Sequence, residues 1–268
     1  MPEPVVEVPP LTAPVDRLLA ALRRSHEGLA ARAQALDETG LTRRSYCTDW
    51  SVAQVLSHLG SGAEIFGLLL DAGLTGGEPP PREAFQPIWD RWNARSAPEQ
   101  AASWRRSDGT LVERLESLDD QQLASMHVPM FGMEIDAARL ASMRLSEHSV
   151  HSWDVAVALD PAAQLAPDAV DLLAETLSLL ASRLGKPQGE QFRLRVRTTS
   201  PQRDLLLTVD SEVRLTEAAG QQADGELRIS CEAFIRLMYG RLDPRHTPDG
   251  VEAEGVSLDS VRAVFPGF

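Results

Sequence analysis

Hydrophobic residues at helical spacing dominate the start of the chain. Residues 11–36 carry apolar side chains every three or four positions, and Gly40 follows as a helix stop. A second helical segment begins after Trp50, where Ser51 and Gln54 have the spacing of a capping box. Both segments are therefore predicted to be helices.

Two further helical segments follow in the first half. Residues 85–118 are mostly helical in pattern, with breaks expected at Pro98 and Gly109. Residues 134–159 form the last segment, while residues 127–136, which precede and overlap its start, are interpreted as a buried connector or a loop over a site. The first half is thus predicted to be helical.

The second half mixes helices with short strands. A helix is expected over residues 167–184, after which the apolar positions alternate with period two. Four segments show this alternation: QFRLRVRT, RDLLLTVD, SEVRLTE and GELRISC. A helix through CEAFIRLMYGRL, a proline-rich loop and a short helix at residues 258–264 complete the chain. The fold class is therefore α+β, with domains predicted at 1–162 and 163–268.

Composition and charge narrow the function to small-molecule chemistry. The 268 residues are 43% apolar and carry a net charge of −13, which disfavours nucleic-acid and membrane-surface partners. Cys47 and Cys231 form no C-x-x-C pair, so they are interpreted as ordinary thiols of a cytoplasmic protein. Lys186 is the single lysine among 26 basic residues, and the Ala, Arg and Gly content is typical of a GC-rich bacterium.

Three side chains could close on one metal ion. Glu147 and His151 are four residues apart on one helical face, and His58 lies in the inward stripe of the second predicted helix. Two ligands from one helix and one from another leave coordination positions open, as in catalytic zinc sites. Imidazole and carboxylate also accept other first-row divalent ions. His148 points about 100° away from Glu147, so it is interpreted as a surface histidine or as one that supports the ligands from behind.

Two neighbours of these ligands have alternative roles. Asp154 is placed to accept a hydrogen bond from the His151 ring nitrogen that does not face the metal, which would fix the tautomer. It could instead be a buried carboxylate paired with an arginine. Arg144, on the same face, could be that partner or could hold a substrate carboxylate.

The chain resembles the mycothiol-dependent maleylpyruvate isomerase family of the DinB-like metalloenzyme superfamily. Three segments carry the resemblance: Trp50, Ser51, Val52 and His58; then Arg144, Glu147, His151 and Asp154; then FIRLMYGRL with the proline-rich loop and final helix. The resemblance implies a DinB-like four-helix bundle followed by a smaller domain similar to sterol-carrier proteins. By analogy, His58, Glu147 and His151 match the zinc ligands of the family.

The resemblance also implies a reaction. Zinc would ionise the thiol of mycothiol, and the thiolate would add to a double bond conjugated to a carbonyl. Elimination of the thiol gives cis–trans isomerisation, and departure of another group gives S-transfer. Arg144, or Arg241 in the YGR turn, would hold the acid groups and stabilise the enolate, although Arg241 could equally cap a helix on the surface. The alternatives are a thiol-independent zinc hydrolase and a non-enzymatic protein that binds a small ligand in its second domain.

Overall fold

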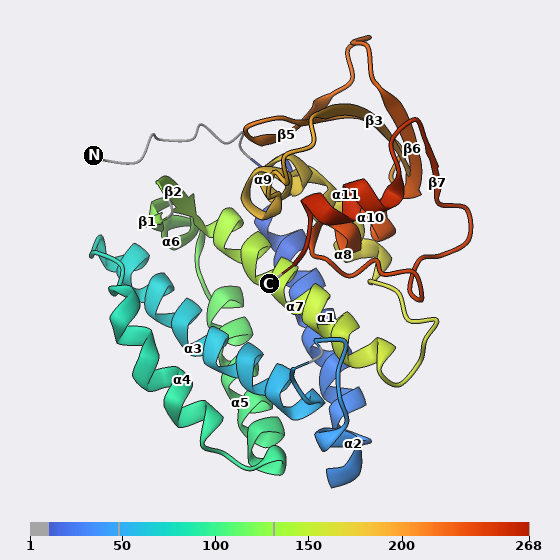
Figure 1. The fold of residues 1–268 in the computed structure, drawn as a ribbon. Helices are drawn as coiled ribbons and strands as arrows, with labels where there is room; N and C mark the ends of the chain where they lie inside the picture. The colour runs from blue at the N-terminus through green and yellow to red at the C-terminus, as the bar shows by residue number, and fades with distance from the viewer. Residues whose placement is uncertain (1–10, 48, 131, 268) are drawn as a thin grey trace. The chain divides into compact units, whose positions relative to one another are not determined.

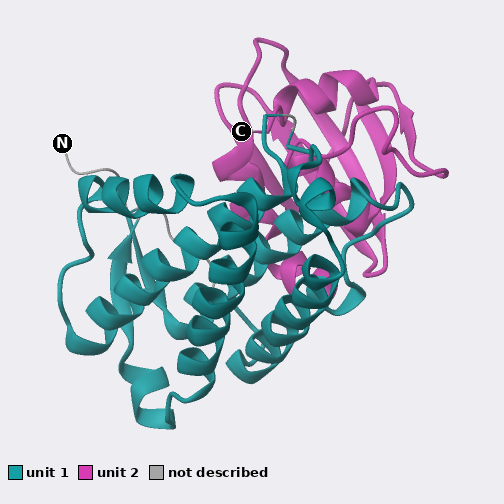
Figure 2. Cartoon of the chain, turned by 90° about the horizontal axis from the view of Figure 1, so that it is seen from below, with its two compact units in different colours: residues 1–169 teal, residues 170–268 magenta. Residues whose placement is uncertain are grey.

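The computed structural model describes residues 11–47, 49–130 and 132–267 (Figure 1). The chain divides into two compact units, residues 1–169 and 170–268 (Figure 2). The boundary predicted at 162/163 stays a prediction, and helix α8 (Pro167–Leu173) spans the observed division. Each unit is described by itself below.

Four long helices form the first unit, as predicted. The helix α1 packs against α7 and α5, and α3 packs against α5, α7 and α4. Short elements connect them. The helices and strands of this unit are α1 (Val15–Gln34), α2 (Glu38–Thr42), α3 (Val52–Thr75), η1 (Arg82–Phe85), α4 (Gln86–Asn93), α5 (Ala97–Glu116), α6 (Asp120–Ser125), β1 (His127–Met130), β2 (Met133–Asp136) and α7 (Ala137–Val157).

Side-chain caps determine where two of these helices begin. At α3 the predicted capping box is present, since Ser51 accepts a hydrogen bond from the Gln54 amide and the Gln54 side chain accepts one from the Ser51 amide. A second box at Ser96 starts α5, with Pro98 in its first turn. The break predicted near Pro98 is thus real, but the one at Gly109 is wrong because that residue lies inside α5.

The start predicted for the last long helix, residue 134, is wrong. Residues 127–130 and 133–136 form the two strands of an antiparallel hairpin, in which Val128 pairs with Ile135 and both are fully buried. Gly132 takes a positive φ of 72° in the turn, a conformation open to glycine at little cost. Asp136 then accepts a hydrogen bond from the Arg139 amide, so α7 begins only at Ala137.

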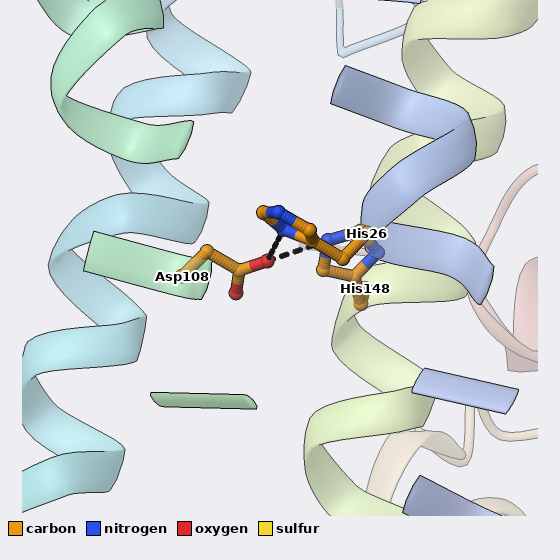
Figure 3. Close-up of side chains that lie close together, drawn as sticks. All are labelled: His26, Asp108 and His148. Atoms are coloured by element: carbon orange, nitrogen blue, oxygen red, sulfur yellow. Dashed lines mark hydrogen bonds and ion pairs between the residues drawn. The ribbon is translucent and has the colours of Figure 1, made fainter. Parts of the chain in front are cut away.

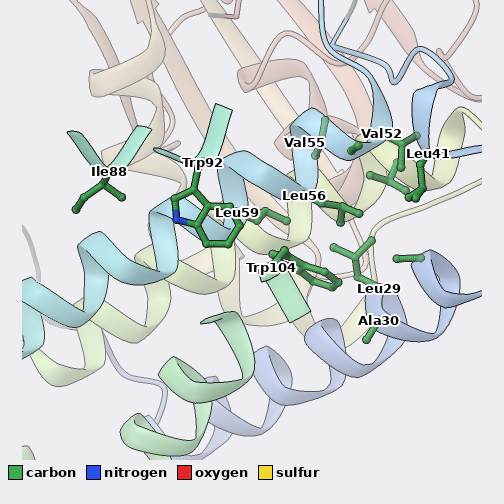
Figure 4. Close-up of a cluster of buried hydrophobic side chains, with 13 residues drawn as sticks. Leu29, Ala30, Leu41, Val52, Val55, Leu56, Leu59, Ile88, Trp92 and Trp104 are labelled. Carbon is green, nitrogen blue, oxygen red and sulfur yellow. The ribbon is translucent and has the colours of Figure 1, made fainter. Parts of the chain in front are cut away.

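An apolar cluster drawn from α1, α2, α3, α4, α5 and α7 packs the interior of the first unit (Figure 4). Trp92 of α4 and Trp104 of α5 are its largest members, and both are almost completely buried. A Cβ atom at Gly60 of α3 would lie 2.2 Å from the Trp92 ring, so only glycine permits this contact between α3 and α4. The cluster fixes the position of α3 within the bundle.

The second unit is a five-stranded sheet with helices. The strand order is β5-β4-β3-β6-β7, antiparallel except between β3 and β6. The helix α9 packs against β5, and α10 packs against β3 and β6. The elements are α8, η2 (Ala174–Thr176), α9 (Leu177–Leu184), β3 (Phe192–Thr199), β4 (Arg203–Val209), β5 (Val213–Glu217), β6 (Gly225–Ser230), α10 (Cys231–Met238), β7 (Glu252–Glu254) and α11 (Leu258–Val264).

The α+β fold class is confirmed, and so are the four strands predicted from period-two patterns. The strand β7 was missed because all three of its residues are exposed and only one is apolar. The similarity of this unit to sterol-carrier proteins stays a prediction. Among the helices of the described residues, none has the length and hydropathy needed to cross a membrane.

Candidate metal centre

The structure brings His58, Glu147 and His151 together. A Glu147 carboxylate oxygen lies 3.2 Å from His58 Nε2 and 3.7 Å from His151 Nε2. The two imidazole rings meet edge to face, with centroids 4.6 Å apart. One donor atom from each side chain lies within 4.8 Å of the others. The helix α3 supplies the first residue, and one turn of α7 supplies the other two.

Exposure shows that one side of this group is open. The side chains of His58 and Glu147 are 36% and 39% exposed, whereas that of His151 is 11% exposed. The inference that His58 faces a packed interior holds only in part, because its ring packs against Trp50 and His151 while the side chain stays partly exposed. His58 and Glu147 lie at the edge of the packed interior, so the group is partly exposed to solvent.

Charge and burial oppose each other at two of these residues. Burial would raise the pKa of Glu147, but the hydrogen bond with His58 and the adjacent histidines lower it to about 2. At His58, burial lowers the pKa from its ordinary value and outweighs the carboxylate of Glu147. The arrangement therefore favours an ionised carboxylate beside a neutral imidazole, and these are the forms in which both side chains bind a metal.

Asp154 lies behind His151. Its carboxylate is completely buried, and Oδ2 lies 2.8 Å from His151 Nδ1, so the ring nitrogen that faces Glu147 is the other one, Nε2. Cys47 Sγ donates a hydrogen bond of 3.1 Å to the same Asp154 oxygen. Carboxylate partners of this kind fix the tautomer and orientation of metal-binding histidines.

The donor set fits a catalytic zinc ion. Two imidazole nitrogens and one carboxylate oxygen are a common set in catalytic sites, where a further position stays open. The exposed side of His58 and Glu147 provides such a position, and Asp154 supports His151 from behind. These residues would thus hold a divalent ion accessible to a small molecule.

A second polar cluster lies in the interior of the same unit (Figure 3). Asp108 of α5 accepts hydrogen bonds on Oδ2 from His26 of α1, at 2.5 Å, and from His148 of α7, at 3.1 Å. Its Oδ1 pairs with Arg144 of α7, which also donates to the Leu59 carbonyl of α3 at 2.7 Å. Three helices therefore meet at the Asp108 carboxylate, and Arg144 links the network to a fourth, α3.

These contacts revise two expectations. His148 is completely buried, so it is no surface histidine, and its other nitrogen bonds the hydroxyls of Ser25 and Ser152. Arg144 does pair with a buried carboxylate, but that carboxylate is Asp108, which sequence spacing did not reveal. Because the Arg144 side chain is 1% exposed, it would have to leave this pair to reach a substrate.

The buried cluster has the residue types of a metal site, but protein groups already compensate the charge of its carboxylate. Although burial opposes the charge of Asp108, the nearby Arg144 and the two histidines hold its pKa well below the ordinary value. Its carboxylate accepts from three donors, and Arg144 supplies a compensating charge. The cluster therefore reads as a structural hydrogen-bond network.

Arg241 belongs to the second unit. It follows the end of α10 and donates a hydrogen bond of 2.5 Å to the carbonyl of Tyr239, the C-cap residue. This is the helix-capping role weighed in the sequence, except that the side chain is buried rather than on the surface. Its role toward a substrate stays a prediction.

Sequence reasoning missed Cys47, His26 and Asp108. Each lies on a different segment from the ligand motifs, and none has a spacing that relates it to them. His26 and Asp108 each carried a signal, since both lie at helical spacing from inward-facing apolar residues of their own helices. Tertiary structure alone brings these residues to α7.

Comparison with known proteins supports the same family. The chain resembles the crystal structure of the mycothiol-dependent maleylpyruvate isomerase with a TM-score of 0.68 and 17% identity, over 91% of this chain and 95% of that one. A histidine-to-alanine mutant of that enzyme gives a TM-score of 0.68 at 16% identity, with the same coverage. At this identity the likeness establishes the fold. No curated protein sequence matched the chain.

A match at the level of the family is more direct. Residues 22–156, half of the chain, match the family described as the mycothiol maleylpyruvate isomerase N-terminal domain. The matched segment contains all three candidate metal ligands and Asp154. The chain therefore belongs to the mycothiol maleylpyruvate isomerase N-terminal domain family.

Proposed function

We propose that this protein is a zinc- and mycothiol-dependent enzyme that adds a thiolate to an electrophilic small molecule. The observation that carries the proposal is the convergence of His58, Glu147 and His151 on one partly open space. Membership of the family supports the thiol as cosubstrate. The reaction is a cis–trans isomerisation of the maleylpyruvate type or an S-transfer.

The side chains of the site divide the work. His58, Glu147 and His151 would hold the ion, and zinc bound there would lower the pKa of a coordinated thiol from about 8.5 so that the thiolate is present at neutral pH. Asp154 keeps the His151 Nδ1 proton in place. Trp50, whose ring centroid lies 5.2 Å from that of His58, would provide an apolar surface beside the site.

The arginines take different parts in this proposal. Arg144 would act indirectly, because its guanidinium holds the α3 backbone at Leu59, the residue after His58. Arg241 remains the candidate for the acid groups of the electrophile and for the negative charge that develops on its carbonyl oxygen. For Arg241, this role requires a guanidinium nitrogen that stays accessible beside its bond to Tyr239.

Cobalt substitution tests the proposal. Purified protein is freed of metal and titrated with Co²⁺, and its visible spectrum is recorded before and after mycothiol is added. We expect a tetrahedral-type spectrum that gains a thiolate-to-cobalt charge-transfer band with mycothiol. His58→Ala and Glu147→Ala should lose cobalt binding, whereas His127→Ala, which removes an exposed histidine of the hairpin, should retain it.

Two other outcomes would redirect the assignment. Cobalt binding without a sulfur band would favour a hydrolase in which the ion activates water. Absence of cobalt binding by the wild-type protein would overturn the metal site itself, and a copurified apolar ligand would then favour a binding protein.

A further inference from the structure

The turn that leads into α3 is held on two sides. Ser45 and Trp50 are joined by a backbone hydrogen bond of 3.0 Å, and the Trp50 amide donates to the Cys47 carbonyl at 2.7 Å. The Tyr46 amide donates to the Asp154 carbonyl at 3.1 Å, which ties the turn to α7. These bonds hold the Cys47 backbone beside α7, and the thiol bond to Asp154 then places its side chain.

Cys47 reaches the group behind His151. Its thiol is half-buried and donates to Asp154 Oδ2, the oxygen that also bonds His151 Nδ1. Two donors on one oxygen restrict rotation of the carboxylate, because turning it would break both hydrogen bonds. The orientation of the His151 ring then depends on Cys47 through Asp154.

We propose that Cys47 is a positioning residue for the metal centre: its thiol holds the Asp154 carboxylate, which in turn orients His151 toward the ion. The inference rests on the proposed function, since it assumes that His151 is a metal ligand. Cys47 lies outside the group formed by His58, Glu147 and His151, although its thiol, His151 and Asp154 also bring potential donor atoms together. The thiol donates to Asp154 Oδ2, and we assign it this hydrogen-bond role rather than that of a ligand.

The substitutions Cys47→Ala and Cys47→Ser separate this role from simple packing. Alanine removes the donor, and serine keeps an O–H donor of similar size. Losing a direct hydrogen-bond partner of a metal-binding histidine lowers metal affinity roughly 10- to 100-fold. Cys47 contacts Asp154 rather than His151 itself, so for Cys47→Ala we expect a smaller loss of Co²⁺ affinity, about 3- to 10-fold. Cys47→Ser should stay within about twofold of wild type.

A double-mutant cycle tests whether the effect passes through Asp154. Asp154→Ala alone should lose more affinity than Cys47→Ala, and adding Cys47→Ala to it should cause no further loss. Cys231→Ala removes the buried thiol of the other unit and serves as the matched control, with unchanged cobalt affinity. Thermal midpoints and helix content of each metal-free variant show whether a loss of affinity reflects a loss of fold.

Three results would overturn the inference. In the first, Cys47→Ala binds Co²⁺ as tightly as wild type. In the second, Cys47→Ala lowers the Co²⁺ affinity by the same factor in the wild-type protein and in the Asp154→Ala variant. In the third, the wild type shows a sulfur-to-cobalt band before any thiol is added and Cys47→Ser abolishes it, which would make Cys47 a ligand. Failure of the wild type to bind cobalt would instead refute the proposed function.

Discussion

Replacing Asp108 by asparagine should strongly destabilise the helical unit. The carboxylate is completely buried and receives hydrogen bonds from His26, His148 and Arg144. Asparagine has nearly the same shape, but it leaves the Arg144 charge without its counter-ion in the interior. Removing one partner of a buried ion pair costs about 3–5 kcal/mol, because the remaining charge stays desolvated.

Asp71→Asn is a matched control for this prediction. Asp71 also pairs with an arginine, Arg114, and this pair joins α3 to α5, whereas the Asp108 pair joins α5 to α7. The Asp71 and Arg114 side chains are 57% and 39% exposed, so water already screens the charges and the pair contributes only about 0–1 kcal/mol. The two substitutions change the same atoms and differ mainly in burial.

Urea unfolding of the metal-free proteins, followed by circular dichroism, measures the difference. With a denaturant dependence of about 1–3 kcal/mol per M, Asp108→Asn should lower the midpoint by at least about 1 M, while Asp71→Asn should leave it nearly unchanged. Equal midpoints for the two variants would refute the reasoning that the buried network stabilises the bundle.

Four further predictions follow from the same structure. The difference in the free energy of unfolding between wild type and Asp108→Asn should be constant at neutral pH and decrease only below about pH 3.8. A carboxyl whose pKa is depressed in the folded state loses its contribution as the pH falls below its unfolded pKa. Unfolding midpoints of both proteins, measured as a function of pH, check this. Gly60→Ala should lower the free energy of unfolding by roughly 1–3 kcal/mol, because the added methyl overlaps Trp92. Gly28→Ala, at an exposed position of α1 with open space around it, should raise the free energy of unfolding by up to about 1 kcal/mol. Thermal unfolding measures both changes. Burial raises the pKa of Cys231 to about 11, so mass spectrometry should find it unmodified by iodoacetamide at pH 8 until the protein is unfolded. Zinc at 100 times its dissociation constant should stabilise the helical unit by about 2.7 kcal/mol, and a chelator should reverse the rise in thermal midpoint.

Local sequence signals predicted most of the fold. The capping box at Ser51 and the period-two strands depend on neighbouring residues, which the sequence displays directly. The hairpin strands at residues 127–130 and 133–136 were not predicted, because Pro129 and several polar positions obscure their alternation and, of the strand residues, only Val128 and Ile135 are buried. The strand β7 depends on its partner β6 rather than on its own composition.

The candidate site was predictable to the extent that one helix carries it. Glu147, His151 and Asp154 are related by the helical repeat, so their shared face follows from spacing alone. The partners of those residues come from other segments: Cys47 from the turn before α3 and His58 from α3 itself. The inward stripe of the second predicted helix suggested that His58 could join them, and the family resemblance supported that grouping.

The helix α7 explains why the two polar clusters should not be treated as independent. Glu147 and His151 lie on one face of the helix, and Arg144 and His148 lie on the neighbouring face, where they bond Asp108. Arg144 also bonds the α3 backbone at Leu59, next to His58. The distance between the ligands of α3 and those of α7 is therefore set partly by the buried network, so a change at Asp108 should reach the metal centre without touching any of its ligands.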